Sequence, residues 1–113
     1  MRAATFRARA LSLPDAVELE TWGEATFRVR NKIFAMLGGD GKRASIKTTR
    51  DEQQALIEED PGAYFYPEYV GVHGWIGVVV AKADRDQVEE LLTEAWRMTA
   101  PKRLVAAFDA GAA

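Results

Sequence analysis

The residues best suited to chemistry in this sequence are six basic side chains on and beside two predicted β-hairpins. If Phe27 and Val29 of an alternating strand face the core, Arg28 and Arg30 project from the opposite side of the strand. Two neighbouring basic hairpins could hold phosphate groups on either side of a nucleic-acid groove. The alternative is a solvated strand face whose charges prevent aggregation. The six residues are Arg28, Arg30, Lys32, Lys42, Arg43 and Lys47.

The distribution of charge along the chain leaves the same two alternatives open. Residues 1–50 contain ten Lys/Arg against five Asp/Glu, a net charge of +5, and the remaining residues contain five against twelve, a net charge of −7. Such asymmetry can mark a face that binds polyanions. Alternatively, two oppositely charged halves neutralise each other within one folded unit, which fits the overall net charge of −2.

A second candidate site lies in the aromatic-rich segment 63–74 and the residue that follows it. Its side chains could stack on bases or line a small-molecule pocket, or they could close one end of the hydrophobic core. Histidine is the residue type best suited to proton transfer near neutral pH, so the single histidine, His73, could act as a general acid or base. A loop histidine without a catalytic role is the alternative interpretation. The residues of this alternative ligand pocket are Tyr66, Tyr69, His73 and Trp75.

Other catalytic and metal-binding patterns are missing from the sequence. There is no cysteine, and the single histidine has no second imidazole with which to hold a metal. Acidic residues within 18–24 and 58–60 offer oxygen ligands, but the two groups are separated in the sequence. The glycine-rich stretch 38–41 joins strand to strand, so it lacks the helix N-terminus of a phosphate site. We therefore expect a non-enzymatic binding protein without a metal or cofactor.

The first half of the chain is predicted to form a short helix and four strands. Phe6, Ala10 and Leu13 share one helical face, and Pro14 ends this helix, which covers residues 3–12. Apolar and polar residues then alternate in four short segments separated by turn residues. Because no crossover helices lie between them, these strands must pair antiparallel. Their predicted ranges are 17–21, 25–30, 32–37 and 44–47.

The second half is predicted to add helices around a fifth strand. Thr49 and Glu52 form a capping box that begins a helix ending near residue 59. Residues 75–81 are mostly apolar and predict a central strand. Asp84 begins a long helix that reaches residue 99, and one or two further helical turns are predicted over 103–108. The apolar face of the long helix consists of Val88, Leu91, Leu92, Ala95 and Met98.

These elements predict a single α+β domain over residues 1–113, in the order α-β-β-β-β-α-β-α. An antiparallel five-stranded sheet with helices packed on one face is the arrangement that buries the apolar side of each element. The long helix should pack on this sheet through Leu91 and its apolar neighbours.

A set of short motifs follows this pattern along nearly the whole chain. The motifs are Leu13-Pro-Asp-Ala-Val-Glu18, Trp22-Gly23, Thr26-Phe-Arg-Val29, Lys32-Ile-Phe-Ala35, Ser45-Ile-Lys47, Tyr69-Val-Gly71, Gly74-Trp75 and a final helix ending near Ala100-Pro101. In this order, they resemble the MmcQ/YjbR-like family. The resemblance implies a small α+β fold similar to the frataxin-like CyaY topology. It also implies DNA binding, by analogy with the double-wing domain of a phage transcription factor.

The sequence departs from the family pattern in two places. Val72 and His73 stand where members often carry a basic residue before the Gly-Trp pair, which removes a positive charge from a binding surface. Thr48-Thr49-Arg50 replaces a proline that many members carry after Ser-x-Lys, which changes only how the next helix begins.

Together, these features predict a cytoplasmic monomer that binds duplex DNA weakly and without sequence preference through the six basic residues. The longest apolar run, residues 76–81, is far shorter than the ~20 residues that cross a bilayer, and the N-terminus does not resemble a secretory signal. About three to five phosphate contacts would give a slope of about −3 to −5 in log K against log salt. The alternative function is a small-molecule-binding or enzymatic domain that uses the aromatic loop 64–75.

Overall fold

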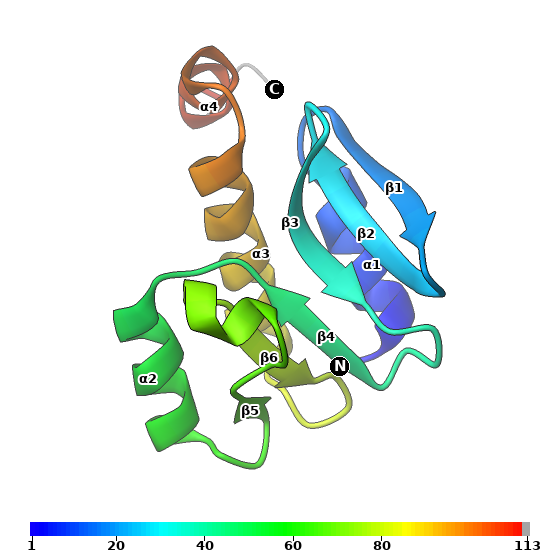
Figure 1. Ribbon diagram of the computed structural model, residues 1–113. Helices are drawn as coiled ribbons and strands as arrows, with labels where there is room; N and C mark the ends of the chain where they lie inside the picture. The colour runs from blue at the N-terminus through cyan, green and yellow to red at the C-terminus, as the bar shows by residue number, and fades with distance from the viewer. Residues whose placement is uncertain (112–113) are drawn as a thin grey trace.

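A six-stranded antiparallel sheet and four α-helices make up the part of the protein that the computed structural model describes, residues 1–111 (Figure 1). The strand order is β1-β2-β3-β4-β6-β5, so the first four strands form successive hairpins. The predicted α+β class and the antiparallel sheet are confirmed. The strands are β1 Ala16–Thr21, β2 Glu24–Val29, β3 Lys32–Leu37, β4 Arg43–Ile46, β5 Tyr64–Phe65 and β6 Ile76–Val79.

The prediction of five strands was one strand short, because β5 lies in the segment predicted to be irregular. Tyr64 and Phe65 pair antiparallel with Val78 and Gly77 of β6, at the edge of the sheet. Two residues are too few to show an alternating pattern, so this strand depends on tertiary contacts with β6.

The two helices with predicted N-terminal caps begin where the sequence predicts them. The Thr49 hydroxyl accepts a hydrogen bond from the Glu52 amide at 3.2 Å, and the Asp84 carboxylate accepts one from the Gln87 amide at 3.1 Å. Both contacts satisfy amides that have no partner within the helix. Among residues 1–111, no helix is long and apolar enough to cross a membrane. The helices are α1 Ala3–Ser12, α2 Arg50–Glu59, the 3-10 helix η1 Val70–His73, α3 Arg85–Thr99 and α4 Lys102–Asp109.

Helices α1 and α3 pack on one face of the sheet, which we call the covered face; both lie behind the strands in Figure 1. Phe6 of α1 contacts Phe27 of β2, with ring centroids 6.0 Å apart. Trp96 of α3 is fully buried, and its indole N–H donates to the carbonyl of Pro14 at 2.9 Å. The predicted packing of α3 on the sheet is confirmed, because four of its predicted apolar residues are buried: Val88, Leu91, Leu92 and Ala95.

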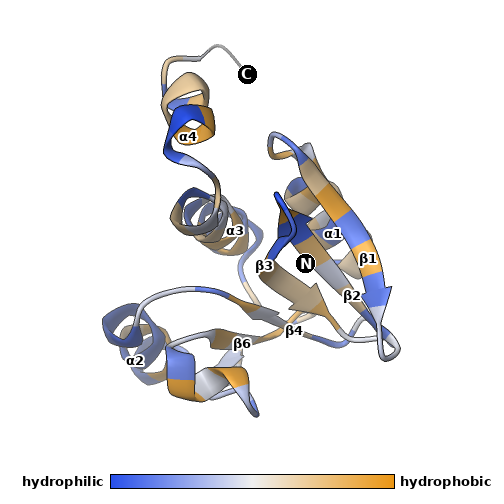
Figure 2. Ribbon diagram, turned by 45° about the horizontal axis from the view of Figure 1, so that its top comes forward, coloured by the Kyte–Doolittle hydropathy of each residue, from blue (hydrophilic) through white to orange (hydrophobic). Residues whose placement is uncertain are grey.

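The opposite face of the sheet, which we call the open face, has no helix over β1, β2 and β3 in the described part of the chain (Figure 1). Strand β1 alternates hydrophobic and hydrophilic residues (Figure 2), and its large hydrophobic residues are about half exposed. Val17 and Leu19 pair with Arg28 and Thr26, and they remain 49% and 47% exposed. Glu18 instead reaches α1, where Arg7 donates to its carboxylate at 2.9 Å.

Candidate functional site

Three of the six predicted basic residues share the open face. Arg28 of β2 pairs with Val17 and Ile33. Arg43 in β4 and Lys47 just after it each lie two residues from Ser45. Because side chains alternate along a strand, Arg43, Ser45 and Lys47 project from one side, opposite to the buried Ala44 and Ile46.

Arg28 lies along the middle of the open face. Its Nε donates to the Thr26 hydroxyl at 3.1 Å, and its Nη2 donates to the Thr21 hydroxyl at 3.2 Å. Both partners are neutral, so the guanidinium keeps its full positive charge without a carboxylate partner in these contacts. The hydrogen bonds also explain why the Thr26 side chain is buried on a face that carries no helix.

The other three basic residues lie at the two ends of the sheet. Arg30 and Lys32 flank the turn between β2 and β3, while Lys42 belongs to the loop between β3 and β4. The expected pair of neighbouring basic hairpins therefore does not form, because β3 runs the length of the sheet between the two turns (Figure 1). Arg30 is further neutralised by Asp15, whose carboxylate accepts hydrogen bonds from Arg30 at 2.9 and 3.1 Å.

The turn at the Arg30 end needs two residues in the left-handed region, not only the predicted Asn31. Arg30 has φ +48° and Asn31 has φ +70°. A two-residue turn with both φ values positive matches the right-handed twist of the flanking strands, and asparagine tolerates this conformation better than most residues. The Asp15 carboxylate holds the less suitable arginine in place.

A groove of about 680 Å³ lies where the open face meets the segment from β5 to η1. The sheet supplies Met36, Arg43 and Ser45, and the facing segment supplies Tyr66 and Tyr69. The guanidinium of Arg43 lies over the ring of Phe65, with its central carbon 4.9 Å from the ring centroid. The groove therefore combines aromatic walls with one cation. Two carboxylates also line it, from Glu24 and Glu68.

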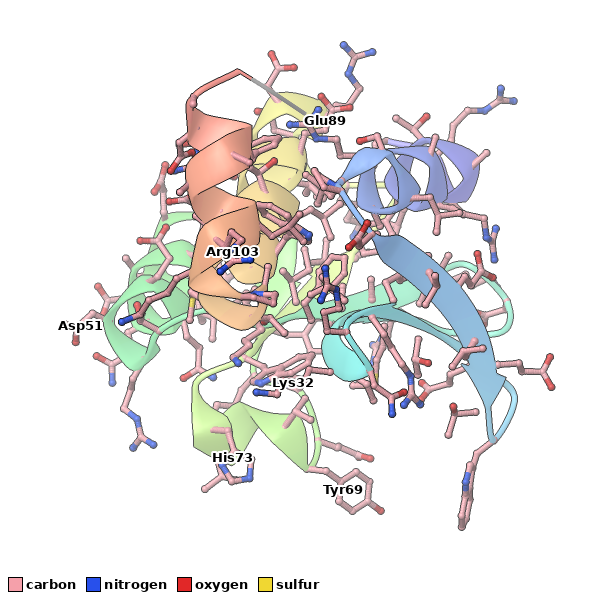
Figure 3. All side chains as sticks on the ribbon, turned by 90° about the horizontal axis from the view of Figure 1, so that it is seen from above. Lys32, Asp51, Tyr69, His73, Glu89 and Arg103 are labelled. Carbon is pink, nitrogen blue, oxygen red and sulfur yellow. The ribbon has the colours of Figure 1, made fainter. Side chains whose placement is uncertain are left out.

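The groove contains only part of the predicted aromatic pocket. Tyr66 and Tyr69 line it, but His73 and Trp75 do not. His73 and Tyr69 lie at opposite ends of η1, and both project away from the body of the protein (Figure 3). Trp75 is half-buried next to β6. The four residues thus do not all line one pocket.

Gln53 of α2 positions η1 and was not identified from the sequence. Its side chain is buried, and its amide Nε2 donates to the carbonyls of Gly71 and Trp75 at 2.9 and 2.6 Å. One glutamine in a largely polar helix carries no signal of this role, because the partners lie about 20 residues further along the chain. Met36, Glu24 and Glu68 were also missed, since only the tertiary fold brings them to the groove.

Tyr64 is the one aromatic residue of this segment that clearly belongs to the core. It faces the covered side from β5, and its hydroxyl donates to the Gln87 side chain at 2.5 Å. Burial raises the pKa of Tyr64 to about 12, with a smaller contribution from the negative charges of Asp60, Asp84 and Glu59. Tyr64 therefore stays neutral at physiological pH and contributes to packing.

Within residues 1–111, no group of three or more histidine, cysteine, aspartate or glutamate side chains is arranged to hold a metal ion. The groups that line the groove are the Arg43 cation, aromatic rings, two carboxylates and the Ser45 hydroxyl. Such groups can bind and orient a ligand.

These features define a class of small α+β domain in which a hairpin-built antiparallel sheet is covered by helices on one face only. The chain belongs to the YjbR family, whose model matches residues 11–98. It is similar to the uncharacterized proteins Rv2570 of Mycobacterium tuberculosis (strain ATCC 25618 / H37Rv) and Mb2600 of Mycobacterium bovis, each 44% identical over 54 residues. The matched stretch covers 48% of this chain and 42% of each relative, so the chain matches less than half the length of these proteins.

A solved structure supports the fold. The protein is similar to Deinococcus radiodurans protein DR2400, a DUF419 domain, with a TM-score of 0.74 and 18% sequence identity. The similarity covers 81% of this chain and 73% of the other. At this identity, the likeness concerns the arrangement of helices and strands.

Proposed function

We propose that the chain is a non-enzymatic DNA-binding domain that contacts the phosphate backbone with the open face of its sheet. The observation that best supports this proposal is that Arg28, Arg43 and Lys47 share a sheet face without a helix over β1 to β3. Cations on an accessible surface bind phosphates by releasing condensed counterions, which requires no base contact. The half-exposed Val17 and Leu19 on the same face also suit a surface that another molecule contacts.

The geometry favours phosphate contacts across the open face over contacts from two neighbouring basic hairpins. The strongest basic region of the open face consists of Arg28 and Lys47. Lys32 adds a positive charge at the β2–β3 turn, beyond the end of this face, and Arg30 is partly neutralised there. Arg43 lies beside the carboxylates of the groove, which weaken its attraction for phosphate. We therefore expect about three or four phosphate contacts and weak binding, with a salt slope of about −3 to −4 for duplex DNA.

The test is a salt titration followed by the fluorescence anisotropy of a labelled DNA duplex. The variant Arg28→Glu/Lys47→Glu reverses two charges of the open face and should reduce the magnitude of the slope by about 2. Arg2→Glu/Lys82→Glu is the matched control, because it changes the net charge equally at exposed positions outside the open face. The control should keep most of the wild-type slope.

Two results would count against the proposal. The first is a wild-type protein that does not bind the duplex at low salt. The second is an equal loss of affinity in both double variants, because overall charge would then explain the binding without any defined surface.

A further inference from the structure

We infer that the open face binds single-stranded DNA in preference to duplex DNA, with one base stacked in the groove between β4 and η1. This inference rests on the proposed function and specifies the form of DNA that the open face takes. Three observations support the inference: the groove has aromatic walls, charged side chains line it, and it lies beside Arg28.

Two glycines leave room for aromatic rings of the groove to pack directly on the backbone. A Cβ atom at position 77 would collide with the ring of Phe65, and one at position 71 would collide with the ring of Tyr66. Both rings therefore lie directly against the backbone, where no other residue type leaves room for them. Rings held in this way are arranged before a ligand arrives, so binding orders few side chains.

Tyr69 is presented at the edge of the groove by an unusual backbone. Its φ of +62° and ψ of −59° place it at the centre of a γ-turn, in which the Val70 amide donates to the Glu68 carbonyl at 2.6 Å. This form of turn is rare and strained for a residue with a side chain. The Tyr69 side chain is 89% exposed and projects outward in Figure 3, so the ring is free to stack on a planar group.

The charges of the groove select a base rather than a phosphate. The carboxylates of Glu24 and Glu68 would repel a phosphate, but they can accept hydrogen bonds from the amino groups on a base edge. Arg43 can donate to base carbonyl and ring nitrogen acceptors from the other side. The Phe65 ring is already covered by the Arg43 guanidinium. The exposed rings of Tyr66 and Tyr69 therefore supply the surface on which any base can stack.

Arg28 supplies the phosphate contact next to this groove. Its guanidinium is held on Thr26, which pairs with the groove residue Met36 on the neighbouring strand, and neighbouring strands lie about 4.8 Å apart. One nucleotide can therefore place its base in the groove and direct its phosphate to Arg28. In a duplex, the base faces are already stacked on their neighbours, so only an unpaired strand can use both contacts.

The experiment compares a labelled mixed-sequence oligonucleotide of about 12 nucleotides with the same sequence as a duplex, by fluorescence anisotropy at low salt. We expect the single strand to bind more tightly. Tyr69→Ala should weaken single-strand binding by about 5- to 150-fold and leave duplex binding unchanged. Tyr69→Phe keeps the ring and should bind like the wild type, and Val72→Ala is a matched control at an exposed position of η1.

The outcomes separate this inference from the proposed function. If the duplex binds as well as the single strand and Tyr69→Ala has no effect, the inference is wrong and the backbone-binding proposal stands. If neither form binds, both are wrong. Because Tyr69 is exposed, its alanine variant should unfold at the wild-type urea concentration, which verifies that any loss of affinity is local.

Discussion

The covered and open faces of the same sheet use apolar side chains in opposite ways. On the covered face, Phe27, Phe34 and Trp96 are fully buried and hold α1 and α3 against the strands. On the open face, Val17 and Leu19 are about half exposed, and no helix of the described residues packs on them. The difference indicates that core packing lies on the covered side of the sheet, whereas the open face keeps apolar side chains accessible.

A matched pair of tryptophans gives the largest expected effect. Trp96 is fully buried, whereas Trp22 is 98% exposed in the β1–β2 turn. Trp96→Ala should lower the free energy of unfolding by about 3–5 kcal/mol, because it leaves a cavity and an unpaired Pro14 carbonyl. Trp22→Ala should change it by less than about 0.5 kcal/mol. Urea unfolding curves measure both; similar losses in the two variants would contradict the division between the faces.

The pH dependence of stability should reveal the burial of Tyr64 on the covered side. Its pKa is raised to about 12 in the folded protein, above about 10 in the unfolded chain, so the folded state retains the proton at higher pH. The stability that Tyr64 contributes is therefore complete below about pH 10 and is lost as the pH rises towards 12. The variant Tyr64→Phe lacks this titration and separates it from that of the lysines.

The measurement is the difference in unfolding free energy between wild type and Tyr64→Phe at several pH values. This difference should shift in favour of the variant as the pH rises from about 10 to 12. A difference that stays constant over this range would mean that Tyr64 ionises equally in both states, and would place it outside the buried face.

The ion pair of Arg30 with Asp15 gives the smallest expected effect. Asp15→Asn removes the carboxylate but keeps a side chain that tolerates the positive φ of +59° at this position. Because the pair is exposed, stability should change by no more than about 1 kcal/mol. Affinity for DNA should rise, by less than about tenfold, since Arg30 then becomes available to phosphate. Anisotropy titration measures the change; weaker binding would exclude Arg30 from the contact surface.

Most of the fold could be predicted because its signals are local. The caps at Thr49 and Asp84 and the apolar face of α3 each depend on residues within a few turns of one helix. The orientation of strand β1, in contrast, depends on a tertiary contact. Its alternation identifies a strand but not which side is buried, and the contact of Glu18 with Arg7 reverses the usual choice.

The candidate site was predictable in part for the same reason. Strand alternation correctly separates Arg28 from Phe27 and Val29, but the opposite positions of the two basic turns follow from the path of β3. The groove could not be predicted, because it depends on the backbone of Tyr69 and on Gln53, which reaches η1 across a long stretch of sequence. Neither feature leaves a periodic signal.

The most direct test of the open face as the binding surface is a map of amide chemical shifts by NMR while a single-stranded oligonucleotide of about 12 nucleotides is added. We predict that the largest changes occur on the open face and beside the groove, at Arg28, Met36, Ser45 and Val70, while Ala10 and Leu92 on the covered side stay unchanged. Changes concentrated on α1 and α3 instead, or no changes at low salt, would contradict the assignment of the open face as the binding surface.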